Sequence, residues 1–238
     1  MKCLIVAAGQ GARLREKAEL KPMVSLLGKP LIEHVIDRGR LAGIDTFLVV
    51  NGYRGDELRL ELDRLSLQKN VSITHIVNDE WTRSNGVSLL KGKPYLDEPF
   101  LLTMCDHLVD PRILQDLVSA SIEPESVTLA VDFNVHSLLN DPEDVTRVSC
   151  VGNRIERIGK MLKDFNAFDT GVFLCSPVIF DALEASQAQG DDTISGAMNV
   201  LADWKKAFTF DVGDKLWIDI DDPAAFQKAE DLLSEGRL

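Results

Sequence analysis

The sequence predicts an α/β fold in which a mixed, mostly parallel sheet is flanked by helices. Short apolar runs alternate with amphipathic stretches through the first half of the chain, as expected for strands joined by crossover helices. The length of 238 residues suits one domain of this class, and 45% hydrophobic residues is ordinary for a folded globular protein. A glycine-containing turn follows the first apolar run, where such sheets bind ligands.

The first apolar run, residues 4–8, is predicted to be a buried parallel strand because it contains no polar residue. It breaks at Gly9 and Gly11, and the residues that follow are typical of the start of a short helix. Glycines let the backbone approach a ligand, and the free amides at a helix start attract anions. Arg13 and Lys21 add two cations. The glycine pattern alone leaves two interpretations open: a phosphate cradle, or a tight turn with surface charges.

Hydrophobic periodicity indicates the remaining elements of the first half. Pro30 suits a helix start, and Gly43 suits a helix stop. Parallel strands connected in this way place their ligand outside the carboxyl ends of the strands, where Gly9, Gly11, Asn51, Asp106 and Asp132 fall. We expect helices over residues 31–41, 56–65, 87–90 and 111–120, and strands over residues 46–50, 71–77, 100–105 and 127–131.

The second half of the chain has a different character. Gly152 and Asn153 lie between two short strand-like runs and indicate a hairpin. We therefore expect one domain over residues 1–238 with a small β-rich lobe. The expected elements are a hairpin over 146–151 and 154–158, strands over 168–174 and 207–212, and helices over 177–186, 193–204 and 224–233.

Composition and charge exclude several classes of protein. A net charge of -12 argues against a nucleic-acid partner, which usually binds a basic surface. The four cysteines form no CxxC pair, so a zinc site is not expected. The sequence has neither a signal-peptide pattern nor a run of the roughly 18 to 20 apolar residues that span a membrane. The cytoplasm is the expected compartment.

Two carboxylates, Asp106 and Asp219, follow apolar strand residues. Either one alone is more often a helix cap or a turn residue. Together with the glycine turn they indicate a Mg²⁺ site, since magnesium binds carboxylate and phosphate oxygens. Asp221 is a possible further ligand, or an exposed turn carboxylate.

Four sequence motifs together resemble those of a known protein family. They are LIVAAGQGARL over residues 4–14, LKPMVSLLGKPLIEHVI over 20–36, MCD over 104–106 and WIDIDDP over 217–223. In this order and spacing the chain resembles the sugar-1-phosphate nucleotidyltransferase superfamily along essentially its whole length. The resemblance implies a Rossmann-like, GT-A-like fold. It also implies a nucleotide-binding half over about residues 1–132, and an acceptor-binding half with the second metal ligand over about residues 133–238.

The resemblance also implies a role for each matching residue. Met23 stands where many members have a second lysine, which leaves Lys21 as the principal cation of its segment. The implied roles are nucleotide binding by Ala7, Ala8, Gly9, Gly11, Asn85 and Gly86; transition-state stabilisation by Arg13 and Lys21; metal binding by Asp106 and Asp219; and acceptor binding by Asp132, Lys160 and Asp169.

The substrates follow from two further stretches. NDEWTRSNGVSLL, over residues 78–90, resembles cytidylyltransferases that act on phosphocholine or inositol phosphate. Residues 141–173 resemble the inositol-1-phosphate cytidylyltransferase group, with Val145 and Arg147 as mild departures. Choline binding needs an aromatic cage, and only 6% of the residues are aromatic. We therefore expect CTP and inositol-1-phosphate to give CDP-inositol and pyrophosphate. In that group the domain is often fused to a membrane-embedded synthase for an inositol-phosphate osmolyte, a possible partner.

Several alternatives stay open. Phosphocholine or a hexose-1-phosphate could be the acceptor, and a non-catalytic nucleotide-sensing subunit could share the fold, although such subunits commonly lose a residue equivalent to Lys21, Asp106 or Asp219. A dinucleotide-binding dehydrogenase fits poorly, because Leu14 replaces the third glycine of its motif and the second strand ends at Asn51 rather than at an acidic residue. Oligomeric state is left open.

Overall fold

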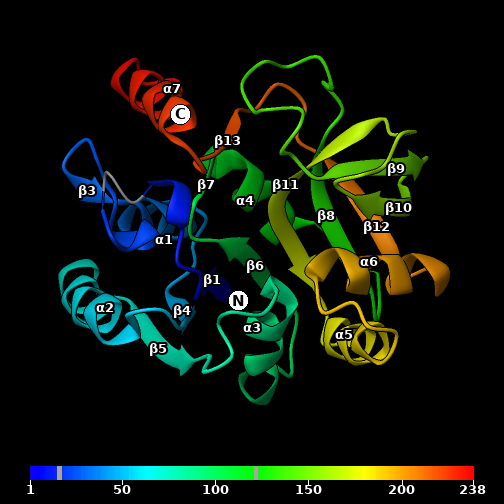
Figure 1. Cartoon of the computed structure of the whole chain (residues 1–238), viewed down its shortest axis with the longest axis horizontal. Helices are drawn as coiled ribbons and strands as arrows, with labels where there is room; N and C mark the ends of the chain where they lie inside the picture. The colour runs from blue at the N-terminus through cyan, green and yellow to red at the C-terminus, as the bar shows by residue number, and fades with distance from the viewer. Residues whose placement is uncertain (15–17, 121–122) are drawn as a thin grey trace.

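A nine-stranded sheet forms the centre of the molecule in the computed structural model, which describes residues 1–14, 18–120 and 123–238 (Figure 1). The strands of this sheet are β1 (Lys2–Ala7), β4 (Thr46–Asn51), β5 (Ser72–Val77), β6 (Phe100–Met104), β8 (Val127–Asp132), β9 (Arg147–Val151), β10 (Arg154–Gly159), β11 (Ala167–Cys175) and β12 (Ala207–Asp211). Two short antiparallel pairs are β2 (Ser25–Leu26) with β3 (Lys29–Pro30), and β7 (His107–Val109) with β13 (Trp217–Asp219).

The helices agree with the hydrophobic periodicity, with shifts of a few residues at their ends. They are α1 (Leu31–Leu41), α2 (Gly55–Lys69), α3 (Asn85–Lys91), α4 (Pro111–Ser119), α5 (Val178–Ala188), α6 (Ile194–Asp203) and α7 (Pro223–Ser234), with 3-10 turns η1 (Ala12–Leu14), η2 (Lys21–Met23) and η3 (Lys93–Tyr95). The helix expected after the first strand is thus a single 3-10 turn as far as Leu14, and residues 15–17 lie outside the described part of the chain. No helix in the described ranges is long and apolar enough to cross a membrane.

The strand order is β5-β4-β1-β6-β11-β8-β12-β10-β9. The neighbours β5, β4, β1 and β6 are parallel, as the alternation of strands and helices predicts. The sheet is mostly parallel, as expected, but β11 from the second half of the chain lies antiparallel between β6 and β8. The sheet is therefore mixed, and only β10 and β11 run against the direction of its other strands.

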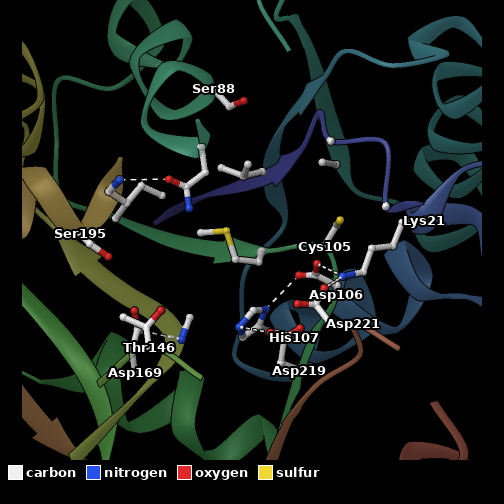
Figure 2. A pocket seen from close by; sticks show the side chains of 18 of the residues that line it. Lys21, Ser88, Cys105, Asp106, His107, Thr146, Asp169, Ser195, Asp219 and Asp221 are labelled. Carbon is white, nitrogen blue, oxygen red and sulfur yellow. Dashed lines mark hydrogen bonds and ion pairs between the residues drawn. The ribbon is translucent and has the colours of Figure 1, made fainter. Parts of the chain in front are cut away.

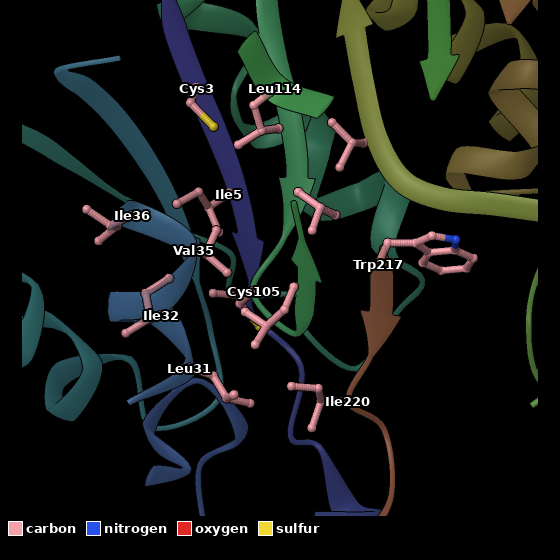
Figure 3. Close-up of a cluster of buried hydrophobic side chains, with 14 of the residues drawn as sticks. Cys3, Ile5, Leu31, Ile32, Val35, Ile36, Cys105, Leu114, Trp217 and Ile220 are labelled. Carbon is pink, nitrogen blue, oxygen red and sulfur yellow. The ribbon is translucent and has the colours of Figure 1, made fainter. Parts of the chain in front are cut away.

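Helices cover both faces of the sheet, and successive residues of β1 point to opposite faces. Cys3 and Ile5 of β1 belong to a core cluster with residues of α1, α2 and α4, part of which Figure 3 shows. Leu4 and Val6 belong to a second cluster with residues of α3, α5 and α6. Burial on both faces explains why this strand reads as a continuous apolar run.

The hairpin expected in the second half is present. β9 and β10 are antiparallel, and Gly152 at their turn has the positive φ of +60° that this type of turn requires. The hairpin extends the nine-stranded sheet through pairing with β12 and β11. The strands that we expected to form a small acceptor lobe thus continue the main sheet.

The pair β7–β13 joins segments that are far apart in the sequence. Asp219 lies opposite His107, and Trp217 lies opposite Val109. Just beyond the pair, the amide of Ile220 donates to the carbonyl of Asp106 over 3.0 Å. This short sheet brings the Asp219 segment to the carboxyl end of β6.

Candidate active site

A cleft of about 380 Å³ opens at the carboxyl ends of β1 and β6 and the start of β11 (Figure 2). The antiparallel direction of β11 places its first residues beside the last residues of β6. The structure therefore brings together residues that the sequence analysis selected from both halves of the chain. The selected residues that line the cleft are Ala7, Gly9, Gly11, Lys21, Asn85, Asp106, Lys160, Asp169, Asp219 and Asp221.

Four selected residues are not part of the cleft lining. Ala8 is buried, and its carbonyl accepts a hydrogen bond from the amide of Tyr53. Gly86 packs so closely on the carbonyl of Asp192 that an added Cβ would lie 2.4 Å from it. Arg13 lies at the edge and reaches the cleft through ion pairs, and Asp132 lies behind it, as described below.

The glycine turn and Lys21 form one packed unit. Gly11 has a φ of +63°, and a Cβ there would lie only 2.3 Å from the Cβ of Lys21. The lysine side chain is 7% exposed, and its Nζ lies 2.5 Å from Oδ2 of Asp106 and also contacts Asp221. A residue with a side chain at position 11 would therefore push the ammonium group away from the carboxylates.

Asp106, His107 and Asp219 form a compact cluster at the floor of the cleft, with candidate ligand atoms within 4.8 Å of one another. His107 Nδ1 lies 2.9 Å from Oδ1 of Asp106, and its Nε2 lies 3.8 Å from Oδ2 of Asp219. The imidazole needs the space at Gly171, where a Cβ would lie 2.4 Å from the ring. Both this contact and the φ of +75° explain why residue 171 is a glycine.

Burial and mutual charges together shift the pKa values of this cluster. Burial raises the pKa of Asp219 to about 7, and the nearby carboxylates of Asp106 and Asp221 add to the rise. Burial would also raise the pKa of Asp106, but Lys21 and His107 hold it well below its usual range. Burial alone would lower the pKa of His107, and the surrounding carboxylates instead raise it to about 9. The cleft thus concentrates charge of both signs where water is partly excluded.

The cluster fits a magnesium ion by its donor set. Asp106 and Asp219 offer carboxylate oxygens, the ligands that Mg²⁺ prefers. Oδ1 of Asp219 is buried and accepts no hydrogen bond within the described chain. A buried carboxylate oxygen without a donor is unfavourable, and a cation would satisfy it.

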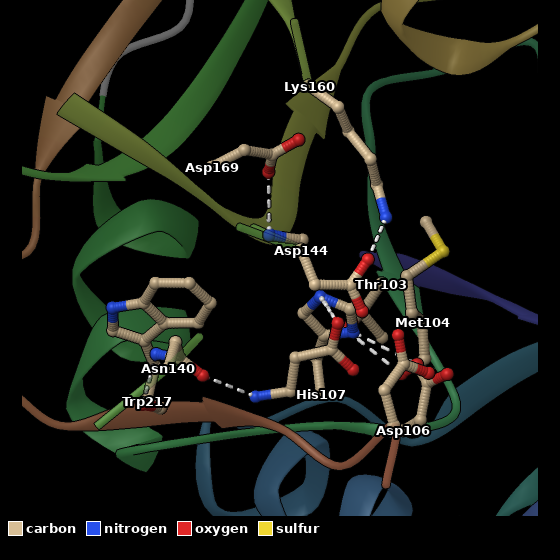
Figure 4. Close-up of polar contacts among 12 residues, drawn as sticks. Thr103, Met104, Asp106, His107, Asn140, Asp144, Lys160, Asp169 and Trp217 are labelled. Carbon is tan, nitrogen blue, oxygen red and sulfur yellow. Dashed lines mark hydrogen bonds and ion pairs between the residues drawn. The ribbon is translucent and has the colours of Figure 1, made fainter. Parts of the chain in front are cut away.

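The opposite wall of the cleft carries Asp169 and Lys160 (Figure 4). Oδ1 of Asp169 accepts the amide of Gly171 over 2.7 Å, and burial raises the pKa of this carboxyl to about 6. Lys160 follows the last residue of β10, is 54% exposed, and pairs with Asp144 over 2.5 Å. A cation and a hydrogen-bond acceptor thus lie together on this wall.

The wall near α3 offers neutral hydrogen-bonding groups and an aromatic ring. Asn85 lies at the first residue of α3, and its Oδ1 accepts the amide of Ile194 over 3.0 Å. Ser88 also lines the cleft, and its hydroxyl accepts from the side chain of Asn78 over 2.9 Å. Trp81 supplies an aromatic surface on the same side.

Asp132 does not line the cleft, where we expected it, and instead forms a hydrogen bond with Trp217. Its Oδ2 accepts the indole N–H of Trp217 over 2.9 Å, and its Oδ1 accepts the amide of Asn134 over 2.8 Å. Trp217 in turn stacks on His107, with ring centroids 6.4 Å apart and planes 10° apart. Asp132 is 8% exposed and orients the tryptophan that supports His107.

The sequence analysis missed several residues of the cleft. His107 directly follows Asp106, and that adjacency is a signal that could have identified it. Trp81 and Ser88 lie in the stretch over residues 78–90, and Asp144 lies in the stretch over 141–173, but the resemblance of these stretches assigned no role to the three residues.

Comparison with known proteins gives a consistent result. The MobA-like NTP transferase domain family matches residues 3–204 of the chain. A bifunctional IPC transferase and DIPP synthase of Rubrobacter xylanophilus is 30% identical over 233 residues, which are 96% of this chain and 51% of that protein. The protein of the same description from Aquifex aeolicus is 29% identical over 234 residues, or 97% of this chain and 51% of that protein. The chain spans about half the length of these curated relatives.

Solved structures show the same relationship. The inositol-1-phosphate CTP transferase from T. maritima superposes with a TM-score of 0.86 at 28% identity, over 98% of this chain and 95% of that one. A UDP-glucose pyrophosphorylase complexed with UDP-glucose superposes with a TM-score of 0.81 over 99% of both chains. Because the two sequences are only 19% identical, this superposition shows that they share a fold and no more.

Proposed function

Because this chain belongs to the family of MobA-like NTP transferase domains and is a nucleotidyltransferase, we propose that it joins CTP to inositol-1-phosphate, giving CDP-inositol and pyrophosphate. One observation supports this most directly. The cleft unites a glycine turn and Lys21 on one side with Lys160 and Asp169 on the other, across the carboxylates of Asp106 and Asp219. Two phosphate-bearing substrates would therefore meet between two sets of cations.

The residues of the first half would hold the nucleotide. The backbone at Gly9 and Gly11 can approach the phosphates closely, and Lys21 and Arg13 supply positive charge. Asn85 and Ser88 line the side of the cleft that would receive the base and ribose. Lys21 would act at the transition state, because its position is fixed by packing and needs no reorganisation.

The residues of the second half would hold the acceptor. Lys160 would bind the phosphate of inositol-1-phosphate, and Asp169 would accept hydrogen bonds from ring hydroxyls. A phosphate monoester is largely ionised near neutral pH and needs no strong general base to attack the α-phosphorus. The main contributions of the chain would then be positioning and charge stabilisation.

Asp106 and Asp219 would hold Mg²⁺, and Asp221 could join them. When bound, the ion would reduce the repulsion between the negatively charged phosphates. The chain itself places Lys21 beside the same carboxylates, so that a fixed cation already lies near the reacting phosphate.

The choice of acceptor is supported by the relatives and by the cleft. The T. maritima structure is described as an inositol-1-phosphate CTP transferase, and it covers nearly the whole chain. The acceptor wall is formed by charged and polar groups, which suit a polyol better than a quaternary ammonium. Since the curated relatives combine a transferase with a DIPP synthase, we also propose that a synthase of that kind consumes the CDP-inositol.

The test is a matrix of pyrophosphate-release assays with Mg²⁺. Each of four nucleoside triphosphates is combined with inositol-1-phosphate, phosphocholine or glucose-1-phosphate. Release with CTP and inositol-1-phosphate alone supports the proposal. Preference for another acceptor would replace the substrate but retain the reaction. Nucleotide binding without release from any pair would favour a sensing subunit.

A further inference from the structure

Asp144 connects the two cations that we assign to different substrates. Its Oδ2 lies 2.5 Å from Nη1 of Arg13. Its Oδ1 lies 2.5 Å from Nζ of Lys160, a contact that Figure 4 shows. Each carboxylate oxygen thus takes one cation, as two oxygens of a phosphate group could. These contacts hold the pKa of Asp144 down at about 2, against the effect of its partial burial, so that it is charged at neutral pH.

The loop that carries Asp144 is held in place by its own hydrogen bonds. Oδ1 of Asp141 accepts the amide of Glu143 over 2.9 Å, and the carbonyl of Asp141 accepts the amide of Val145 over 2.9 Å. These bonds form a turn whose geometry points the side chain of Asp144 into the cleft.

Arg147 ties this loop to the loop that follows Lys160. Its Nη1 donates to the carbonyl of Leu162 over 2.9 Å, and its Nη2 donates to the carbonyl of Pro142 over 3.1 Å. The guanidinium also stacks on the ring of Phe165, 5.0 Å from its centre. The planar, forked group of arginine can make these contacts together, whereas a lysine cannot. The spacing between Asp144 and Lys160 is therefore built into the fold.

We propose that Asp144 occupies, in the substrate-free enzyme, the place of a substrate phosphate between Arg13 and Lys160, and so lowers the affinity of the cleft for phosphate ligands. This inference rests on the proposed function, which assigns Arg13 to the nucleotide and Lys160 to the acceptor. A phosphate that binds either cation must break an existing ion pair. A ligand that engages both cations replaces Asp144 completely.

The consequence is a low occupancy of the cleft by small anions. Because a phosphate ligand must displace Asp144, the affinity for every such ligand is lower by a similar factor. Inorganic phosphate and pyrophosphate, which bind mainly through the cations, are then held poorly. The full substrates bind through base, ribose and ring contacts as well, and they remain bound at their working concentrations. The carboxylate thus keeps the affinity for small phosphates, and with it their occupation of the cleft, low.

The test measures binding of inorganic pyrophosphate by titration calorimetry without divalent metal. Asp144→Asn removes the charge but keeps the shape, and Glu143→Gln is a matched control because it removes the same charge from an exposed neighbour. Because all three side chains of the network are partly exposed, each broken pair has the strength of a surface ion pair. We expect Asp144→Asn to bind pyrophosphate about three- to tenfold more tightly than the wild type. Glu143→Gln should stay within about twofold of it.

Unchanged or weaker binding in Asp144→Asn would overturn the inference, because a purely structural carboxylate gives that result. Asp144→Ser is a second variant that tests the same charge if the asparagine protein does not fold. This measurement needs neither CTP nor inositol-1-phosphate, so its result does not depend on whether the proposed substrates are correct. If both substrates are as proposed, their KM values should fall in the same variant.

Discussion

Gly11→Ala tests the link between the glycine turn and Lys21. The structure gives two reasons for glycine at this position. The φ of +63° lies in the left-handed region that a side chain disfavours, and the new Cβ would lie 2.3 Å from the Cβ of Lys21. A Cβ atom is fixed by its backbone, so no change of rotamer in Lys21 can relieve the contact.

The size of the effect follows from this distance. Ordinary carbon contact begins near 3.4 Å, so either the turn or Lys21 must move by about 1 Å. A displacement of that size at a reacting centre can reduce a rate about 100-fold. The left-handed backbone adds roughly 1 to 2 kcal/mol of destabilisation in the free energy of unfolding. We therefore expect kcat/KM to fall about 100-fold and stability to fall moderately.

The assay is pyrophosphate release, combined with urea unfolding. Gly28→Ala is the matched control, because Gly28 has a φ of +81° but open space around its Cβ position. The control should lose similar stability from the backbone alone and keep its activity. If Gly11→Ala keeps kcat/KM within twofold of the wild type, the turn does not position Lys21 and the reasoning is refuted.

Three further predictions concern the metal, a buried carboxylate and pH. Asp106→Asn should lower kcat roughly 10²- to 10³-fold, and EDTA should abolish wild-type activity until Mg²⁺ is restored; full activity in EDTA contradicts the magnesium site. Asp132→Ala leaves the indole N–H of Trp217 buried without an acceptor, so the free energy of unfolding in urea should drop by about 1 to 3 kcal/mol. A large rise in acceptor KM with unchanged stability would instead return Asp132 to acceptor binding. Burial lowers the pKa of His34 in the folded state against the hydrogen bond to the carbonyl of Leu26, and Arg38 and Lys29 add to the decrease while Asp37 opposes it. The unfolded chain therefore takes up the proton first, and stability should decrease as pH falls below about 6.5. Urea unfolding at pH 7.5 and 5.5 should show a smaller loss for His34→Gln, and equal losses would count against this assignment.

Much of the site could be predicted because parallel strands converge at their carboxyl ends. Gly9 and Asp106 follow strands that are direct neighbours in the sheet, and both line the cleft. Asp132 also follows a strand, but β11 separates β8 from β6. The position at a strand end is therefore not sufficient, because the neighbours of that strand decide whether its last residue faces the ligand.

The remaining features depend on contacts that local sequence does not encode. β7 and β13 have three residues each, too few to show a periodicity, yet their pairing brings Asp219 to Asp106. The insertion of β11 between β6 and β8 is a choice of topology that the alternation of strands and helices does not reveal. Asp144 lies in a polar loop, where one carboxylate looks like any other until the fold places Arg13 and Lys160 beside it.

The most direct test of the central claim is to follow labelled oxygen through the reaction. The protein is incubated with Mg²⁺, CTP and inositol-1-phosphate that carries ¹⁸O in its phosphate, and the products are analysed by mass spectrometry. Attack of the acceptor phosphate on the α-phosphorus predicts that all of the label appears in CDP-inositol and that the pyrophosphate is unlabelled. Labelled pyrophosphate, or the formation of CMP without CDP-inositol, would contradict the account.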